Sequence, residues 1–352
     1  MPTTELDILY RCRRAARIEN SAVRVTVLRE GGHIAEIFDR AAAVNPLWTP
    51  EWASIEPSAY KRDAHPQFGS GSDARLLAGI MGHNLCLDVF GGPSDDEAAA
   101  GVPAHGDGSV APYDTETSGG TLVMRARLPA AQLLFERRIE LRDRTVAIRE
   151  TVENLAAFDR PIAWTQHVTL GGPFLQKGVT QFRASATRSK TFEGAFGADD
   201  YLQPSMEFEW PFAPAAGGGR VDLRRFTDAP ASSAYTAHLM DPGRATAFFV
   251  AFSPTANLAL GYVWRRSDFP WLGIWEENVS RTQSPWNGHS LARGMEFGVS
   301  PFPESRRRMV ERGRLFDTPT FRWLPARATV DVEYCAVICP VDAIPESLEW
   351  PP

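Results

Sequence analysis

The chain has 352 residues, which suits one large all-β domain or two ordinary domains, and 43% of them are hydrophobic, enough for a sizeable core. The net charge of -6 at pH 7 gives no reason to expect nucleic acid or an anionic membrane surface as a partner. No stretch approaches the ~18 uninterrupted apolar residues of a membrane-spanning helix, so none is expected.

The cysteines show no pattern of a metal site or a disulfide framework. Cys335 and Cys339 are four apart, but no second pair and no histidine at zinc-finger spacing accompanies them. On a strand they would share one face and serve as small apolar core residues. Four such cysteines fit a reducing compartment, and the N-terminus lacks the basic and apolar regions of a signal peptide. We therefore expect a cytoplasmic protein with no metal and no cofactor.

Strand-like alternation begins early in the chain. Valines recur at every second position in 22–28, Gly31 and Gly32 make a turn, and 33–38 returns as the second arm of a hairpin. Residues 51–75 are mixed in character and predict a loop with one short helix.

Three further strands are predicted at 121–128, 133–141 and 145–154, with short connections typical of an antiparallel meander. The next strand, in 160–175, alternates polar and apolar residues and is ended by Gly171-Gly-Pro173. His167 projects from one face of this strand. Taken alone, it could be a buried histidine bonded to the backbone or the floor of a cleft.

The remainder of the chain continues in the same style. Residues 176–233 are rich in Gly, Pro and Ala and predict a long excursion over the surface, after which strands are expected at 235–239, 245–252 and 258–264. No segment has a convincing amphipathic period longer than about three helical turns. The sequence therefore predicts an all-β protein. Trp264 and Trp323 are expected in its core, and the run Arg306–Arg308 is expected in a solvated turn.

Two regions stand out from this background. In the first, His105-Gly106-Asp107 predicts a tight bend that exposes an imidazole beside backbone amides, although an ordinary surface turn would look the same. In the second, residues 268–304, aromatic and polar side chains alternate. Aromatic rings can cover the apolar face of a pyranose while carboxylates and amides bond its hydroxyls. We expect Trp286 to line such a site, so that replacing it with Ala would weaken sugar binding and leave stability nearly unchanged.

At this point the chain resembles the aldose 1-epimerase (galactose mutarotase-like) superfamily. His105-Gly106-Asp107 is similar to its His-Gly motif, and the strand pair ending at His167 is similar to its Thr-x-x-Asn … Asn-His-x-Tyr-Phe segment. Gly294-Met-Glu-Phe-Gly-Val-Ser-Pro301 resembles the segment that carries the catalytic carboxylate, and Trp275-Glu-Glu-Asn278 falls where the family has a strand beside the sugar. Arg75 stands nearest to the family's early Asn-Arg motif.

The resemblance implies a β-supersandwich of large twisted antiparallel sheets, formed as a single domain over 1–352 with its core at about 20–340. It implies that Glu296 is the catalytic base, that His167 is the acid, and that His105 polarises the ring oxygen or orients the sugar. The expected substrate-binding residues are Trp275, Glu276, Glu277, Asn278, Trp286, Asp107, Gln166 and Arg75. The partner would be a small-molecule sugar, and no cofactor would be needed.

Two alternatives remain open on the same scaffold, because fold alone does not decide function. One is a carbohydrate-binding protein that no longer turns its ligand over. The other is an accessory domain of a polysaccharide lyase or hydrolase. The joint presence of Glu296, His167 and His105 favours the enzyme, and the absence of an appended module speaks against the accessory domain.

Overall fold

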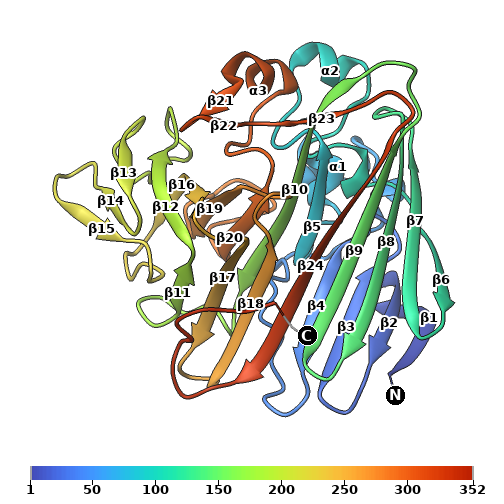
Figure 1. Ribbon diagram of the computed structural model, residues 1–352, viewed down its shortest axis with the longest axis horizontal. Coiled ribbons are helices and arrows are strands. Elements are labelled where there is room, and N and C mark those ends of the chain that lie inside the picture. Colours follow the sequence, from blue (N-terminus) through green and yellow to red (C-terminus); the bar gives the residue numbers. More distant parts are fainter. Residues whose placement is uncertain (1, 351–352) are drawn as a thin grey trace.

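The computed structural model describes residues 2–350, and two large antiparallel sheets dominate it (Figure 1). The 12-stranded sheet has the order β1-β2-β3-β4-β5-β10-β20-β19-β16-β12-β13, with β23 paired to β10. The 8-stranded sheet has the order β11-β17-β18-β24-β9-β8-β7-β6. The all-β architecture predicted from the sequence is therefore confirmed, with the large antiparallel sheets that the resemblance implied.

The strands of the larger sheet are β1 (Thr3–Tyr10), β2 (Arg13–Glu19), β3 (Val23–Leu28), β4 (Ile34–Asp39), β5 (His83–Asp88), β10 (Arg160–Gly171), β12 (Ala186–Thr191), β13 (Glu207–Glu209), β16 (Ser232–Met240), β19 (Trp271–Asn278), β20 (Leu291–Gly298) and β23 (Arg322–Leu324). Those of the smaller sheet are β6 (Asp114–Ser118), β7 (Thr121–Leu128), β8 (Leu133–Arg142), β9 (Thr145–Asn154), β11 (Gln181–Ala184), β17 (Thr246–Ser253), β18 (Leu258–Arg265) and β24 (Thr329–Pro340).

The helices are short and lie toward one end of the sheets (Figure 1): α1 (Ala74–Leu77), α2 (Asp95–Ala99) and α3 (Arg306–Arg312). Two small hairpins complete the fold, β14 (Phe212–Pro214) with β15 (Arg220–Asp222), and β21 (Arg314–Leu315) with β22 (Thr318–Pro319). Within residues 2–350, none of the helices combines the length and apolar character that a membrane span requires.

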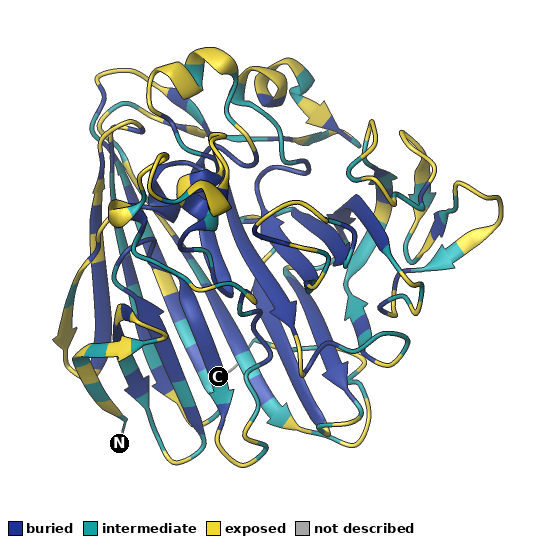
Figure 2. Ribbon diagram, turned by 180° about the vertical axis from the view of Figure 1, so that it is seen from behind, coloured by how far each residue is buried: buried dark blue, intermediate teal, exposed yellow. Residues whose placement is uncertain are grey.

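The main core lies between the two sheets, and the central strands are buried along most of their length (Figure 2). Because side chains alternate along a strand, one face of β10 supplies Trp164, Val168 and Leu170 to this core. The other face of β10 points away from the smaller sheet and is covered by loops. Whether a residue of β10 reaches the core or the loop-covered face thus depends on its position in the alternation.

Several local predictions hold and others are wrong. The meander of β7, β8 and β9 and the end of β10 at Gly171 agree with the sequence. The region 176–233 is not only a surface excursion, since β11 pairs with β17 and β12 pairs with β16. Strands β1 and β2 were not predicted.

Two of the side chains for which the sequence gave a specific expectation, Trp323 and Arg306, depart from it. Trp264 is fully buried, but Trp323 is 58% exposed, because its strand β23 is short and pairs only with the start of β10. Arg306 begins α3 instead of lying in a solvated turn, and it pairs with Asp88 and Glu97.

Both large sheets draw strands from both halves of the chain. That the whole chain forms a single domain stays a prediction.

Candidate active site

A cavity of about 380 Å³ lies on the loop-covered face of the larger sheet. Its lining residues are Trp48, Ser72, Asp73, Leu76, Leu77, Ile80, Phe90, Gly91, Gly92, Ala104, His105, His167, Thr169, Phe196, Tyr235, Trp275, Arg281, Trp286, Glu296 and Pro303. Most of them are apolar or aromatic, with a few polar groups that converge on the sheet. This is the composition of a small-molecule site.

The floor of the cavity is a pair of side chains from adjacent strands. His167 of β10 stands opposite Glu296 of β20 in the antiparallel register, so both project from the same face. Their Nε2 and Oε1 atoms are 3.0 Å apart, and the residues are only 6% and 1% exposed. On its other side, His167 shares a hydrogen bond of 3.0 Å between Nδ1 and the Thr169 hydroxyl. The two groups that the resemblance assigns to acid and base therefore lie in direct contact.

Glycines give Glu296 the space it occupies. Gly273 stands opposite Glu296 on β19, and a Cβ there would lie 2.0 Å from the Tyr235 hydroxyl and 3.4 Å from Oε2 of Glu296. A Cβ on Gly294 would lie 2.3 Å from Oε1 of the same carboxyl. A side chain at Gly294 would displace the carboxyl from the floor of the cavity, and one at Gly273 would displace the Tyr235 hydroxyl beside it.

Burial favours the neutral form of each group on the floor. It raises the pKa of Glu296 to about 8, and a hydrogen bond from Tyr235 opposes this rise only in part. Burial also lowers the pKa of His167 well below its ordinary value, and the neighbouring His105 lowers it further. In the free protein the pair therefore holds one proton at neutral pH, and that proton resides on Glu296.

His105 enters the cavity from a bend whose backbone is tightly constrained. His105 and Gly106 have positive φ values of 62° and 78°, and a Cβ on Gly106 would lie 2.0 Å from the Leu87 carbonyl oxygen. The Gly91 N–H donates to Nδ1 of His105 at 3.2 Å, and the Cys86 sulfur lies 3.0 Å from the same nitrogen. A backbone N–H can only donate, so Nδ1 is an acceptor and the proton of the neutral ring lies on Nε2. Burial lowers the pKa of His105 to about 4, which keeps the ring neutral.

Aromatic side chains form one wall of the cavity. Trp286 stacks on Trp48 with ring centroids 5.7 Å apart, and Trp52 meets both rings edge-on. The guanidinium carbon of Arg281 lies 4.8 Å from the centroid of Trp286 and 5.2 Å from that of Trp275. The planes of the two tryptophans are therefore partly covered by a cation, which the sequence did not predict.

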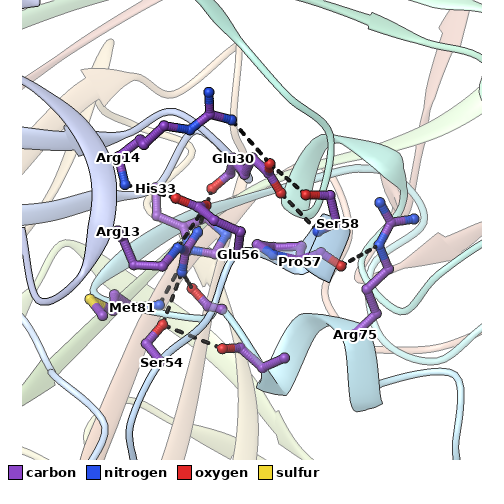
Figure 3. Close-up of polar contacts among 12 residues, drawn as sticks. Arg13, Arg14, Glu30, His33, Ser54, Glu56, Pro57, Ser58, Arg75 and Met81 are labelled. Carbon is purple, nitrogen blue, oxygen red and sulfur yellow. Dashed lines mark hydrogen bonds and ion pairs between the residues drawn. The ribbon is translucent and has the colours of Figure 1, made fainter. Parts of the chain in front are cut away.

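The segment that covers the cavity on one side, residues 46–82, is fastened to β2 by a buried arginine (Figure 3). The fully buried guanidinium of Arg13 donates to the Glu56 carboxylate, the Ser54 hydroxyl and the backbone carbonyls of Gly79 and Glu30, at 2.8 to 3.0 Å. Glu30 in turn accepts hydrogen bonds from the backbone N–H and the hydroxyl of Ser58. Charge-assisted bonds of this kind hold the covering segment in one position.

Not all of the predicted site residues reach this cavity. Glu296, His167, His105, Trp275 and Trp286 line it. Gln166, Glu276 and Asn278 occupy the alternate positions of β10 and β19, so they point to the opposite face of the sheet. There Gln166 donates to Glu150, Glu276 accepts from Ser232, and Asn278 donates to the Ala229 carbonyl.

The other three predicted contacts are also displaced from the lining. Asp107 is buried and accepts hydrogen bonds from the backbone of Ala130 and Ala131. Arg75 is exposed and donates to the Pro57 carbonyl (Figure 3). Glu277 stands on the cavity side of β19 but accepts from the backbone N–H groups of Ser280 and Arg281, so it holds the following turn.

The lining side chains to which the sequence analysis gave no role include Trp48, Asp73, Tyr235 and Arg281. Alternation within 235–239 could have placed Tyr235 on the same face as Ala237, but no local signal tells which face that is. The other three lie in loops, whose docking depends on distant contacts. Within the part of the chain that the structure describes, no three His, Cys, Asp or Glu side chains are placed to hold a metal ion.

No protein-family model matches the sequence, and no curated protein matches it either. Solved structures do resemble the fold. A candidate aldose 1-epimerase from Klebsiella pneumoniae is 11% identical with a TM-score of 0.65, over 96% of this chain and 83% of that one. A galactose mutarotase-like protein from Lactobacillus casei is 14% identical with a TM-score of 0.58, over 92% and 100% of the two chains. Another from Clostridium acetobutylicum is 13% identical with a TM-score of 0.58, over 97% and 99%. The fold is thus galactose mutarotase-like, as the resemblance in sequence implied.

The burial of Trp286 changes the expected effect of replacing it. Because this side chain is 4% exposed and packs on Trp48, Trp52 and Trp275, Trp286→Ala should lower the free energy of unfolding by roughly 3 kcal/mol as well as weaken sugar binding. Denaturant unfolding measures the loss. Trp323→Ala, at an exposed tryptophan, is the matched control and should change stability by less than about 0.5 kcal/mol. Equal stability of the two variants would contradict the packing described here.

Proposed function

We propose that the protein is an aldose 1-epimerase-like isomerase, which interconverts the anomers of an aldose or a sugar derivative. The observation that carries the proposal is the His167–Glu296 pair at the floor of a cavity with aromatic and apolar walls. The galactose mutarotase-like fold of the chain supports it, as do the structural neighbours that are named as candidate aldose 1-epimerases.

The spacing of the pair suits the geometry of a hemiacetal. The anomeric hydroxyl and the ring oxygen are bonded to the same carbon, so the group that removes a proton and the group that delivers one must be neighbours. Transfer of the shared proton from Glu296 to His167 across 3.0 Å yields a carboxylate and an imidazolium. The carboxylate then accepts the proton of the anomeric hydroxyl, while the imidazolium protonates the ring oxygen.

The C1–O5 bond breaks in this step and the open-chain aldehyde forms. Rotation about C1–C2 and reversal of the same proton transfers close the ring in either configuration. The number of protons on the pair is unchanged at the end, so Glu296 and His167 need no other proton source. His105 assists by donating its Nε2–H to the ring oxygen or to a neighbouring hydroxyl, as its tautomer allows.

Anomer exchange measured by NMR or polarimetry tests the proposal directly. A freshly dissolved single anomer of D-glucose or D-galactose should equilibrate faster with the protein than without it. If the protein binds sugars but accelerates no exchange for any of a panel of aldoses, the catalytic proposal is wrong. The carbohydrate-binding alternative would then replace it.

The pH dependence of turnover follows from the single proton of the pair. Since burial raises the pKa of Glu296 to about 8, the free protein loses that proton as the pH rises through about 8. Without it there is no acid for the ring oxygen, so kcat/KM should fall on the alkaline side with an apparent pKa near 8. Exchange rates measured from pH 5 to 10 check this. A rate that stays constant up to pH 10 would contradict a one-proton pair.

A further inference from the structure

The mouth of the cavity carries a second group of polar side chains, distinct from the pair on the floor. Arg281 is the only lining residue within 2–350 with a lysine or arginine side chain, and Asp73 lies in the same lining. Arg281 is partly exposed and Asp73 is exposed, whereas His167 and Glu296 are buried. The two groups therefore lie at different depths of one cavity.

Two acidic groups, Glu277 and Asp73, act on the Arg281 guanidinium, and both oppose the lowering of its pKa by burial.

Arg281 is held in place without using its hydrogen-bonding capacity. Glu277 fixes the start of the turn by accepting from the backbone N–H groups of Ser280 at 2.7 Å and Arg281 at 2.9 Å. The guanidinium lies against Trp275 and Trp286, and its Nε is 3.4 Å from Oε2 of Glu277. Within residues 2–350 it donates no side-chain hydrogen bond. Its Nη donors are therefore available to a ligand in the cavity.

Asp73 offers the complementary acceptor. It precedes α1 as the N-cap residue, but its side chain makes no capping hydrogen bond. The lining of the mouth thus holds one cation, Arg281, and one anion, Asp73, and has no positive charge in excess. An acidic ligand would meet repulsion from the Asp73 carboxylate, whereas neighbouring hydroxyls can accept from a guanidinium and donate to a carboxylate together.

We propose that Arg281 and Asp73 form a recognition site for a pair of neighbouring hydroxyls at the end of the sugar remote from its anomeric carbon, and that they select neutral sugars over acidic ones. The proposal rests on the proposed function only in placing the anomeric carbon at the floor. Trp275 is near both groups: its ring centroid lies 5.9 Å from that of His167 and 5.2 Å from the guanidinium carbon of Arg281.

Binding measured apart from turnover tests the proposal. Isothermal titration calorimetry would compare D-glucose and D-galactose with their 4-deoxy and 6-deoxy analogues and with D-glucuronate. The wild-type protein should bind the neutral sugars most tightly and should lose ~10-fold or more in affinity when one remote hydroxyl is removed. Arg281→Met and Asp73→Ala should each weaken binding of the parent sugar by a similar factor, and the deoxy analogues should then lose little more.

Matched controls separate recognition from general effects of charge. Asp63→Ala and Arg62→Met change exposed residues of the covering segment that do not line the cavity, and they should bind as wild type does. Tighter binding of D-glucuronate than of D-glucose, lost in Arg281→Met, would overturn the proposal in favour of an acidic ligand. Unchanged affinity in Arg281→Met and Asp73→Ala would also overturn it. If binding depends on the remote hydroxyls but no anomer exchange is seen, only the proposed catalysis is contradicted and the recognition site stands.

Discussion

Glu296→Gln should retain sugar binding and lose turnover by roughly 10²- to 10⁴-fold. The amide has nearly the shape of the carboxyl, so the space between Gly273 and Gly294 still accommodates it. It cannot accept the proton of the anomeric hydroxyl, and it cannot carry the shared proton. His167→Asn should reduce turnover by a similar factor, because the ring oxygen then has no acid. Anomer exchange by NMR, with calorimetric binding on the same samples, measures both quantities.

A buried histidine on another strand of the same sheet provides the control. His238 of β16 is fully buried, and its ring bonds the hydroxyls of Ser189 and Thr236 on the face away from the cavity. His238→Asn should therefore alter stability without altering exchange by the folded protein. If His167→Asn and His238→Asn reduce turnover equally, the effect is one of folding and the acid is another group.

The differences between the predicted site residues and the residues that line the cavity follow from the alternation of side chains along a strand. Met295 and Phe297 are apolar, so Glu296 between them had to face the other side of β20, and this could be predicted. The same rule excludes Glu276 from the face of Trp275, and Gln166 from the face of His167. Neighbours along one strand point to opposite faces of the sheet, so alternation alone indicates that only one of each pair can line the cavity.

Contacts between strands and contacts made by loops could not be predicted from local sequence patterns. That His167 stands opposite Glu296 depends on the register of two strands more than a hundred residues apart. Trp48, Asp73 and Arg281 reach the cavity from loops whose position depends on buried polar contacts such as those of Arg13. Strands β1 and β2 lie at the edge of the sheet, where burial is partial and the apolar signal is weak.

On the side of the larger sheet opposite the cavity, the interior between the sheets contains a buried ion pair whose disruption should have the largest effect on stability. Arg137 and Glu150 are both fully buried, and Nε of Arg137 donates to Oε1 of Glu150 at 2.8 Å. Glu150 also accepts from three further donors: Trp164 Nε1, Gln166 Nε2 and the Tyr334 hydroxyl. Both oxygens of this carboxylate therefore accept two hydrogen bonds each. A buried charge is tolerated when its hydrogen-bonding groups are satisfied in this way.

Glu150→Gln should therefore lower the free energy of unfolding by about 3–5 kcal/mol, since it leaves the Arg137 charge buried without a counterion and turns an amide N–H₂ toward groups that donate. Denaturant unfolding at pH 7 measures the loss. Asp331→Ala is the matched control, because it removes an exposed partner of Arg149 from the same pair of strands, β24 and β9, and should change stability by less than about 1 kcal/mol. The double variant Arg137→Met with Glu150→Leu should recover part of the loss, because no charge then remains in the interior. A Glu150→Gln protein as stable as Asp331→Ala would show that the interior tolerates an unpaired guanidinium and that the network does not hold the sheets together.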